Sequence, residues 1–208
     1  MKIVISAGPT REPIDAVRFI TNHSSGKMGF ALARAAAATN LQVILVSGPV
    51  NIPYPTDVEL IKVETAAQMA TAVKKAASDA DIVIMSAAVA DYRPLNIQPG
   101  KLKKTPGNLL LELERTEDIL ASLGNIKPPG QILCGFAAET DNLISNAKEK
   151  LARKNLDWII ANDVGISGQG FASDHNTVTM INASGQQIEL PLADKTIIAQ
   201  QIIAELTK

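Results

Sequence analysis

The sequence predicts an α/β protein with a Rossmann-like, mostly parallel sheet and helices on both faces of that sheet. Short apolar runs without alternation, such as 2–7 and 42–47, are typical of strands buried on both faces. Between such runs lie segments with helical spacing of apolar residues, such as 66–78. Strands that alternate with helices favour a parallel sheet joined by right-handed crossovers. We therefore expect residues 1–208 to form a single domain.

The other regular elements follow in order. We expect strands at 58–63, 81–88, 131–136 and 157–161, and helices at 30–38, from 116 or 118 to 123, at 142–154 and after 194. Thr65 and Asp194 are suitable N-caps for two of the helices. The segments 176–181 and 187–191 flank Asn182-Ala183-Ser184-Gly185, which is a hairpin signal. Antiparallel strands should therefore extend the sheet at its C-terminal end.

The stretch from 93 to 115 breaks the pattern. Its three prolines and two glycines exclude a long regular element. We expect a flap in which 101–104 and 109–113 pair as a ribbon around the Thr105-Pro106-Gly107-Asn108 turn.

A glycine- and serine-rich turn, 22–29, lies between the first strand and an alanine-rich helix. Ser24 or Ser25 could cap that helix, while Gly26 and Gly29 let the backbone approach a ligand. The N–H groups and the positive end of the helix dipole would then bind an anion. An ordinary capped helix is the alternative. The long excursion 8–21 before the turn favours a functional site, because long ordered loops at strand ends usually carry function.

The composition indicates a soluble globular protein. Lys and Arg number 20 against 21 Asp and Glu, a net charge of -1, so the charge balance favours neither nucleic acid nor an anionic membrane as partner. No apolar run reaches the roughly 18 residues of a membrane span. The single Cys134 excludes an internal disulfide, and with no signal peptide before the first strand this favours the cytoplasm. We expect Cys134 to be buried and unreactive.

In an open parallel sheet, ligands bind beyond the carboxyl ends of the strands. Small residues recur at those ends, at 8–10, 86–92, 136–140 and 161–163, which fits close approach of a ligand. For any one of these segments, tight loop packing is the more ordinary interpretation. Lys150 and Lys154 share one helical face, where a solvated charged face is the ordinary interpretation. Lys101, with Lys103 and Lys104, lies on the flap; it could serve solubility or could approach a polyphosphate. His23 and His175 have no spacing that suggests a zinc site.

Seven motifs occur in order along the chain. They are Gly8-Pro9-Thr10-Arg11-Glu12-Pro13-Ile14-Asp15, Asn22-His23-Ser24-Ser25-Gly26-Lys27-Met28-Gly29, Ala87-Ala88-Val89-Ala90-Asp91-Tyr92, Lys101-x-Lys103-Lys104, Gly135-Phe136-Ala137-Ala138-Glu139-Thr140, Lys154-Asn155-Leu156-Asp157 and Ala161-Asn162-Asp163. Together they closely resemble bacterial phosphopantothenoylcysteine synthetase, the phosphopantothenate–cysteine ligase. The resemblance covers essentially the whole chain, and seven coincident motifs are far more specific than any one of them.

The resemblance implies an activity and its co-substrates. Members of that family activate the carboxylate of 4′-phosphopantothenate with CTP, which releases pyrophosphate and leaves an acyl-cytidylate. The amine of L-cysteine then displaces CMP to form the amide. Mg2+ would screen the phosphate charge. The resemblance also implies a homodimer, in which Ala87, Ala88 and Asp91 can face the partner's substrate, and a frequent fusion to a flavin-dependent phosphopantothenoylcysteine decarboxylase. The chain would then be either a stand-alone ligase or one domain of such a fusion.

Roles carry over by position. The nucleotide would be held by Gly8, Pro9, Thr10, Met85, Ser86, Ala87, Asp91, Lys101, Arg115, Thr116, Phe136, Lys150 and Lys154. Phosphopantothenate would be held by Asn22, Ser24, Ser25, Gly26, Gly29, Ala87 and Ala88. Asn22 would orient the acyl-cytidylate for attack by cysteine, and Lys101 would stabilise charge on the α-phosphate. The resemblance assigns no metal ligands and no residues to bind free cysteine.

One departure from the family pattern concerns the nucleotide. Where many bacterial members carry a Lys-Asn-Pro-Asp-like segment after the flap, this chain has Arg115-Thr116-Glu117-Asp118. In the family this segment contacts the nucleotide, so ATP stays open as an alternative to CTP.

Two other functions share this type of sheet. An NAD(P)-dependent oxidoreductase would need a Gly-x-Gly-x-x-Gly turn directly after the first strand, and the sequence has none there. It would also need an acidic residue at the tip of the second strand, where this chain has Ser47-Gly48-Pro49. A non-catalytic nucleotide-binding module would need the anion-binding turn but would have no use for a lysine-bearing flap.

Overall fold

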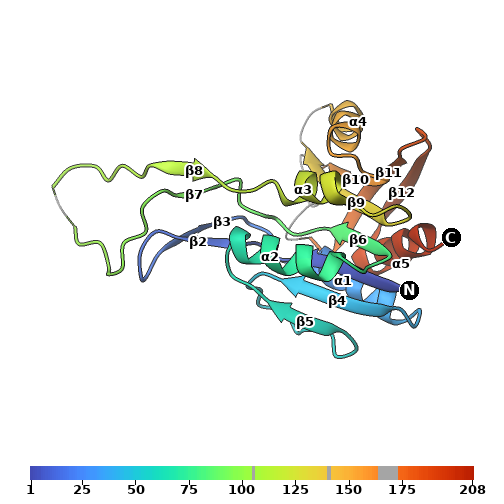
Figure 1. The fold of residues 1–208 in the computed structure, drawn as a ribbon, viewed down its shortest axis with the longest axis horizontal. Helices are drawn as coiled ribbons and strands as arrows, with labels where there is room; N and C mark the ends of the chain where they lie inside the picture. The colour runs from blue at the N-terminus through green and yellow to red at the C-terminus, as the bar shows by residue number, and fades with distance from the viewer. Residues whose placement is uncertain (105, 140–141, 164–172) are drawn as a thin grey trace.

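A computed structural model describes residues 1–104, 106–139, 142–163 and 173–208; Thr105 and Thr140, which belong to predicted segments, lie outside them. Eight strands form the main sheet in the order β12-β11-β10-β9-β6-β1-β4-β5 (Figure 1). Six are parallel: β1 (Lys2–Ala7), β4 (Gln42–Ser47), β5 (Glu59–Lys62), β6 (Ile82–Met85), β9 (Ile132–Glu139) and β10 (Trp158–Asp163). The predicted parallel sheet is confirmed.

The parallel strands have the doubly wound order. Numbered along the chain, they lie as 3-2-1-4-5-6, with β1 between β4 and β6. From β1 the chain crosses first to β4 and then, after β5, returns to β6 on the other side. The strand order therefore reverses between β1 and β6, and a crevice is expected at their carboxyl ends.

The predicted antiparallel extension is also present. Strands β11 (His175–Asn182) and β12 (Gln187–Asp194) pair with each other, and β11 pairs antiparallel with β10. The Asn182 side chain accepts hydrogen bonds from the amides of Ser184 and Gln186 at 3.1 and 2.9 Å, and Gly185 has φ +89°. These local features fix the hairpin turn.

Helices cover both faces of the sheet. Helices α1 (Lys27–Ala37) and α5 (Lys195–Leu206) pack on the face that carries Ile3 and Ile5. Helices α2 (Ala66–Ala77), α3 (Ile119–Ile126) and α4 (Leu143–Arg153) pack on the face that carries Val4. Adjacent residues of a strand point to opposite faces, so β1 is buried on both sides, as its apolar run predicts.

Local signals at the helix ends are partly confirmed. Thr65 forms a capping box with Gln68 at the start of α2, and Asp194 accepts a hydrogen bond from the Thr196 amide at the start of α5. Cys134 is fully buried, and this burial raises the pKa of its thiol. No described helix is long and apolar enough to cross a bilayer.

The expectation that Ser24 or Ser25 caps α1 is wrong. The N-cap is Gly26, with φ +78° and therefore no capping side chain. The Ser24 hydroxyl instead accepts a 3.3 Å hydrogen bond from the Gly26 amide, two residues along. The left-handed turn into the helix needs a glycine at this position, and that geometry excludes a serine cap.

An arm projects from the sheet, at the left of Figure 1. It contains two short antiparallel pairs, β2 (Arg11–Pro13) with β3 (Phe19–Thr21) and β7 (Tyr92–Pro94) with β8 (Leu113–Arg115). The first pair forms part of the excursion after β1, for which no regular element is predicted. The loop that joins β7 to β8 is the predicted flap.

The predicted ribbon within the flap is wrong. Neither 101–104 nor 109–112 forms a strand. The observed ribbon lies at the two ends of the 93–115 stretch, where β7 pairs with β8. The side chains of Arg93 and Glu114 form an ion pair across this pair of strands at 2.8 Å. The pairing continues one step past β7, where the Leu95 amide donates to the Glu112 carbonyl at 3.0 Å. Pro94, which has no N–H, is the last residue of β7 and pairs with Leu113.

Candidate active site

A cavity of about 270 Å³ lies at the carboxyl edge of the parallel strands. It lies at the switch point between β1 and β6, where the strand order predicts a ligand site. Four parts of the chain line it: the start of α1, the loop after β6, the ends of β9 and β10 with α4, and the β11–α5 region. The lining residues are Ser24–Gly29, Ser86–Val89, Asp91, Phe136–Ala138, Lys150, Asn162, Asn176 and Lys195.

A second hollow of about 150 Å³ adjoins the first. The two share the lining residues Ala87, Val89, Asp91, Phe136 and Lys150. The second hollow is completed by Met85, residues 117–120 and Lys154. Sequence analysis did not select residues 117–120 for this site; the departure of this segment from the family pattern was the available signal. Two joined hollows can hold a ligand with two chemically different parts.

The loop after β6 is held by hydrogen bonds to the end of β1 and the residues after it. The Ala87 amide donates to the Ser6 hydroxyl at 3.1 Å, and the Ala88 amide donates to the Gly8 carbonyl at 2.9 Å. The Ala90 amide donates to the hydroxyl of Thr10, which is fully buried, at 3.0 Å. The structure therefore places Gly8 and Thr10 behind the cavity wall, as supports of the 87–90 backbone.

Asn22 contacts the same loop from the other side. Its side-chain amide donates to the Ala88 carbonyl at 3.0 Å. Asn22 lines a separate hollow of about 270 Å³ together with Pro9, Ser24 and Ser25. The two serines line the main cavity as well, so Asn22 lies directly behind the glycine- and serine-rich turn.

Lys150 and Lys154 both line the second hollow. The ordinary interpretation, a solvated charged face, is wrong for Lys154, whose side chain is only 10% exposed and pairs with Asp118 at 2.8 Å. Burial alone would raise the pKa of Asp118, but the hydrogen bonds from Lys154 and from the Ala121 amide lower it below its usual range. Asp118 is therefore ionised at neutral pH and holds the Lys154 ammonium at the edge of the hollow.

Two further lysines, which sequence analysis missed, lie at the α1 end of the main cavity. Lys195 is buried and donates to the Ser173 carbonyl at 2.6 Å, and Lys27 pairs with Asp174 at 2.6 Å. Burial lowers the pKa of Lys195, and the nearby charge of Lys27 adds to the lowering. Because Lys195 opens the last helix, no local signal connects it with a residue at position 27. The positive end of the α1 dipole and the two ammonium groups, of which that of Lys27 is paired with Asp174, would favour an anion at this end of the cavity.

Two buried asparagines complete that end. The side-chain oxygens of Asn162 and Asn176 are buried and have no hydrogen-bond partner among the residues that the structure describes. Both residues line the main cavity. Buried polar groups normally have partners, so they mark this end of the cavity as a place for a polar ligand.

Besides Gly8, Pro9, Thr10 and Asn22, three predicted residues line neither of the two hollows. Lys101 is exposed on the arm and lines neither of them. Arg115 and Thr116 line a different hollow beside α2, and the Thr116 hydroxyl donates to the Ala90 carbonyl at 2.5 Å. The structure thus brings together the turn, the β6 loop, Phe136 and the two α4-end lysines, but not these three.

Gly29 sets how closely α1 approaches β1. A Cβ atom added at Gly29 would lie 2.5 Å from the Cβ of Ala7 and 3.1 Å from the Ser6 carbonyl oxygen. Alanine is normally the better helix former by about 1 kcal/mol. We expect the clash to outweigh that gain and Gly29→Ala to lower the free energy of unfolding by about 1–3 kcal/mol. Urea unfolding measures the change.

Gly100→Ala is the matched control for Gly29→Ala. No atom lies within 4 Å of a Cβ added at Gly100. Its free energy of unfolding should stay within about 0.5 kcal/mol of that of the original protein. A Gly29→Ala variant that is as stable as Gly100→Ala would contradict the close contact between α1 and β1.

The sheet order and the cavity at its switch point define a Rossmann-like α/β domain. All 208 residues match the family described as the DNA/pantothenate metabolism flavoprotein C-terminal domain, and the chain belongs to this family. The resemblance inferred from the seven motifs is thereby confirmed.

Relatives and solved structures agree with this assignment. The chain is 50% identical over 205 residues to the coenzyme A biosynthesis bifunctional protein CoaBC of Bacillus subtilis, covering 98% of this chain and 50% of that protein. It is 46% identical over 209 residues to CoaBC of Escherichia coli K12, covering 99% and 51%. The chain thus spans about half the length of these curated relatives. A crystal structure of a CoaBC C-terminal domain matches with a TM-score of 0.84 at 45% identity, covering 99% of this chain and 93% of that one.

Proposed function

We propose that this domain joins 4′-phosphopantothenate to L-cysteine in coenzyme A biosynthesis, using CTP and passing through an acyl-cytidylate. The observation that carries the proposal is the pair of joined hollows at the switch point. One is lined by the start of α1 with Lys27 and Lys195, and the other by Phe136 with Lys154. A ligase of this kind must hold two anionic substrates side by side. The larger hollow, with Lys27, Lys150 and Lys195 against Asp91, suits an anion, and the smaller one adds Lys154 beside the carboxylates of Glu117 and Asp118.

The chemistry explains why a nucleotide is required. A carboxylate is a poor electrophile because its negative charge repels nucleophiles. Attack of the carboxylate oxygen on the α-phosphorus of CTP releases pyrophosphate and forms a mixed anhydride. The cysteine amine then attacks the acyl carbon, the bond to the cytidylate oxygen breaks, and CMP leaves with its electron pair while the amine loses a proton. The enzyme's main task is to position these groups and to balance their charge.

The cytidine would lie in the smaller hollow. Phe136 supplies an aromatic wall there, Met85 an apolar one, and the ammonium groups of Lys150 and Lys154 lie at the same hollow. Residues 117–120 would contact the nucleotide, with Arg115 and Thr116 holding that segment in place from behind. Gly8 and Thr10 would act through the loop that they support, and not by direct contact.

The phosphate-rich parts of the substrates would lie in the larger cavity. Ser24, Ser25, Gly26 and Gly29 present the start of α1 to it, and Ser86, Ala87, Ala88 and Asp91 line the opposite wall. Asn22, bonded to the Ala88 carbonyl, would orient the acyl-cytidylate for the attack of cysteine. Lys101 would come from the flap to the α-phosphate.

Mg2+ would be carried by the nucleotide. Among the described residues no group of three or more His, Cys, Asp or Glu side chains lies close enough to hold a metal ion. Mg2+ usually keeps several waters and binds through substrate phosphates with one or two carboxylates, and Asp91 is a carboxylate at the cavity wall. When bound, the ion would screen the charge of the triphosphate from the attacking carboxylate.

We also propose that the domain works as a homodimer that uses the arm. Nine of the thirteen exposed large apolar side chains among the described residues lie on the arm: Val17, Phe19, Tyr92, Leu95, Ile97, Leu109, Leu110, Leu111 and Leu113. Exposed apolar surface of this extent is typical of an interface between proteins. A second copy of the chain is the proposed partner, because closed two-fold dimers are the commonest assembly.

Leu110→Glu tests the dimer. Leu110 is 90% exposed, so a charge there should leave the fold intact but should weaken self-association at least about tenfold. Ile126→Glu, at a 64% exposed position at the end of α3, is the control and should leave the mass unchanged. Light scattering over a concentration series measures both. A monomeric original protein, or a Leu110→Glu dimer of unchanged affinity, would contradict the proposed interface.

A decarboxylase is a further proposed partner, since the relatives are bifunctional proteins of about twice this length. Phosphopantothenoylcysteine, the proposed product, would be the substrate of that decarboxylase. The proposed location is the cytoplasm, where CTP and free cysteine are available.

The activity is tested by pyrophosphate release from the purified chain with Mg2+, 4′-phosphopantothenate and CTP, with and without cysteine. We expect release with CTP, followed by CMP formation that depends on cysteine. Parallel reactions with ATP test the nucleotide, because residues 115–118 depart from the family pattern. Release with ATP alone would overturn the CTP assignment. If the folded protein releases no pyrophosphate with either nucleotide, the proposed ligase activity is wrong.

A further inference from the structure

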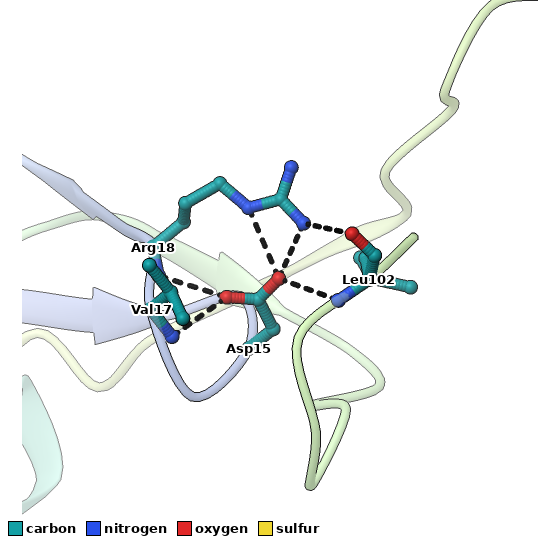
Figure 2. Close-up of polar contacts among 4 residues, drawn as sticks. All are labelled: Asp15, Val17, Arg18 and Leu102. Carbon is teal, nitrogen blue, oxygen red and sulfur yellow. Dashed lines mark hydrogen bonds and ion pairs between the residues drawn. The ribbon is translucent and has the colours of Figure 1, made fainter. Parts of the chain in front are cut away.

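Asp15 lies in the turn that joins β2 to β3, on the arm, and its side chain is fully buried (Figure 2). Its Oδ1 accepts hydrogen bonds from the amides of Val17 and Arg18, both at 2.8 Å. These two bonds are local and shape the turn itself. A surface turn needs no more than this from an aspartate.

The other carboxylate oxygen of Asp15 binds the flap. Its Oδ2 accepts from the Leu102 amide at 3.0 Å, and also from Arg18 Nε at 3.0 Å and from Arg18 Nη2. The guanidinium of Arg18 donates in turn to the Leu102 carbonyl at 3.2 Å. Both backbone groups of Leu102, a residue 87 positions further along the chain, are thus held by this pair, as Figure 2 shows.

A second contact holds the flap at its near end. The Gln98 amide donates to the Ile14 carbonyl at 3.1 Å, so residues 98–102 follow the β2–β3 turn between two fixed points. Lys101 lies between those points, next to Leu102. Its side chain is exposed while its backbone is held on both sides.

The carboxylate of Asp15 is charged and fully satisfied. The hydrogen bond from Arg18 and then that from the Leu102 amide hold the pKa of Asp15 well below its usual range. A buried charge is costly unless it is paired and hydrogen-bonded, and here five donors serve one carboxylate. Two of these donors would suffice for the turn. Of the other three, one is the Leu102 amide and two belong to the Arg18 guanidinium, which itself donates to the Leu102 carbonyl, so this group of bonds holds the flap.

We propose that Asp15 is a positioning residue for the activation step: its Oδ2 holds Leu102 and so fixes where the flap presents Lys101. The inference rests on the proposed function, in which the exposed side chain of Lys101, which lines neither hollow in the free chain, reaches the α-phosphate once the substrates are bound while its backbone stays held. Asp15 itself lines neither hollow.

Asp15→Asn distinguishes the hydrogen bonds that shape the turn from the hydrogen bond that holds the flap. The amide oxygen of an asparagine can still accept from Val17 and Arg18, so the turn is retained. The other atom becomes an NH2 donor that faces the donors of Leu102 and Arg18, so the bond to the flap is lost. Glu114→Gln is the matched control, because it breaks the ion pair with Arg93 on the same arm but leaves the 98–102 segment untouched.

Two measurements follow, on variants whose thermal unfolding is first compared with that of the original chain. Trypsin cleavage after Lys101, Lys103 or Lys104, identified by fragment mass, reports how firmly the flap is held. Pyrophosphate release at saturating CTP reports activation. For Asp15→Asn we expect cleavage to be about tenfold faster and kcat about 10- to 100-fold lower with little change in the KM for CTP, as for a misplaced catalytic group. Glu114→Gln should change neither.

A double variant shows whether Asp15 acts through Lys101. In a Lys101→Gln background, Asp15→Asn should lower the residual rate less than about twofold, since residues that act as one unit are not additive. A full additional loss in that background would overturn the proposal. So would faster flap cleavage with unchanged activation, or unchanged cleavage.

The two proposals fail in distinguishable ways. An original chain that releases no pyrophosphate would overturn the ligase and, with it, the role of Asp15 in positioning Lys101 for activation. The cleavage measurement would still decide whether Asp15 holds the flap.

Discussion

Lys101→Gln is expected to lower the rate of acyl-cytidylate formation by about 100-fold or more, which is the usual loss when one charge-stabilising donor is removed. Negative charge grows on the α-phosphate as pyrophosphate leaves, and an ammonium beside it stabilises that charge. Glutamine keeps the length and polarity of the side chain but not its charge. Because Lys101 is exposed on the arm, the fold should be unaffected. Pyrophosphate release with CTP and phosphopantothenate, without cysteine, measures this step alone.

Lys103→Gln is the matched control for Lys101→Gln. Lys103 is also exposed and lies two residues along the same segment, so it carries the general charge of the flap but not the proposed contact. Its loss should change the rate by less than about threefold, since exposed charges are screened by salt. Equal losses in the two variants would mean that the flap acts only through its overall charge. A normal rate for Lys101→Gln would remove Lys101 from the mechanism.

The elements that sequence could predict are those with local causes. The inner parallel strands, such as β1, β4 and β6, are apolar runs whose residues are mostly buried, and such a run can be recognised without knowing which strand lies beside it. The β11–β12 hairpin was predictable because Asn182 and Gly185 form its turn within a few residues. The family resemblance then supplied the roles of residues that physics alone could not assign.

The arm could not be predicted in the same way. The run at 109–113 looks like the better strand, but the observed pair joins Tyr92 to Arg115, and register there depends on residues outside the flap. The contact of Asp15 with Leu102 spans 87 positions, and the only local signal at Asp15 is that of an ordinary turn. Long-range pairing of this kind leaves no periodicity in the sequence.

In the candidate site, too, the features with local causes could be predicted and those that depend on long-range packing could not. The glycine- and serine-rich turn was recognised because its residues are consecutive, although Gly26 and not a serine begins the helix. Thr10, at a strand end, faces the interior and supports Ala90, because which side of a loop faces the ligand is decided by packing. Lys195 lines the cavity from the start of the last helix. Its place in the site could not be predicted from sequence, because it depends on the packing of α5 beside α1.

In the proposed mechanism, the transfer step depends on Asn22, whereas the activation step depends on Lys101. Asn22 donates its side-chain N–H to the Ala88 carbonyl at 3.0 Å, in the loop that forms the cavity wall. An aspartate has no such donor, and its carboxylate would face a carbonyl oxygen, which repels it. The side chain would then turn away from its present position. Lys101 and the nucleotide hollow would be unaffected by this change.

Asn22→Asp should therefore release the first equivalent of pyrophosphate at a rate within about threefold of the original chain but lose about 100-fold in cysteine-dependent CMP formation, as expected for a misoriented intermediate. The acyl-cytidylate should accumulate to one equivalent per subunit, which rapid acid quenching and chromatography would detect. His23→Asn is the control: His23 is the exposed neighbour and lines the hollow behind the turn, and its loss should leave both steps intact. An Asn22→Asp variant with both steps unimpaired, or with activation reduced as much as transfer, would contradict a role for Asn22 in orienting the intermediate.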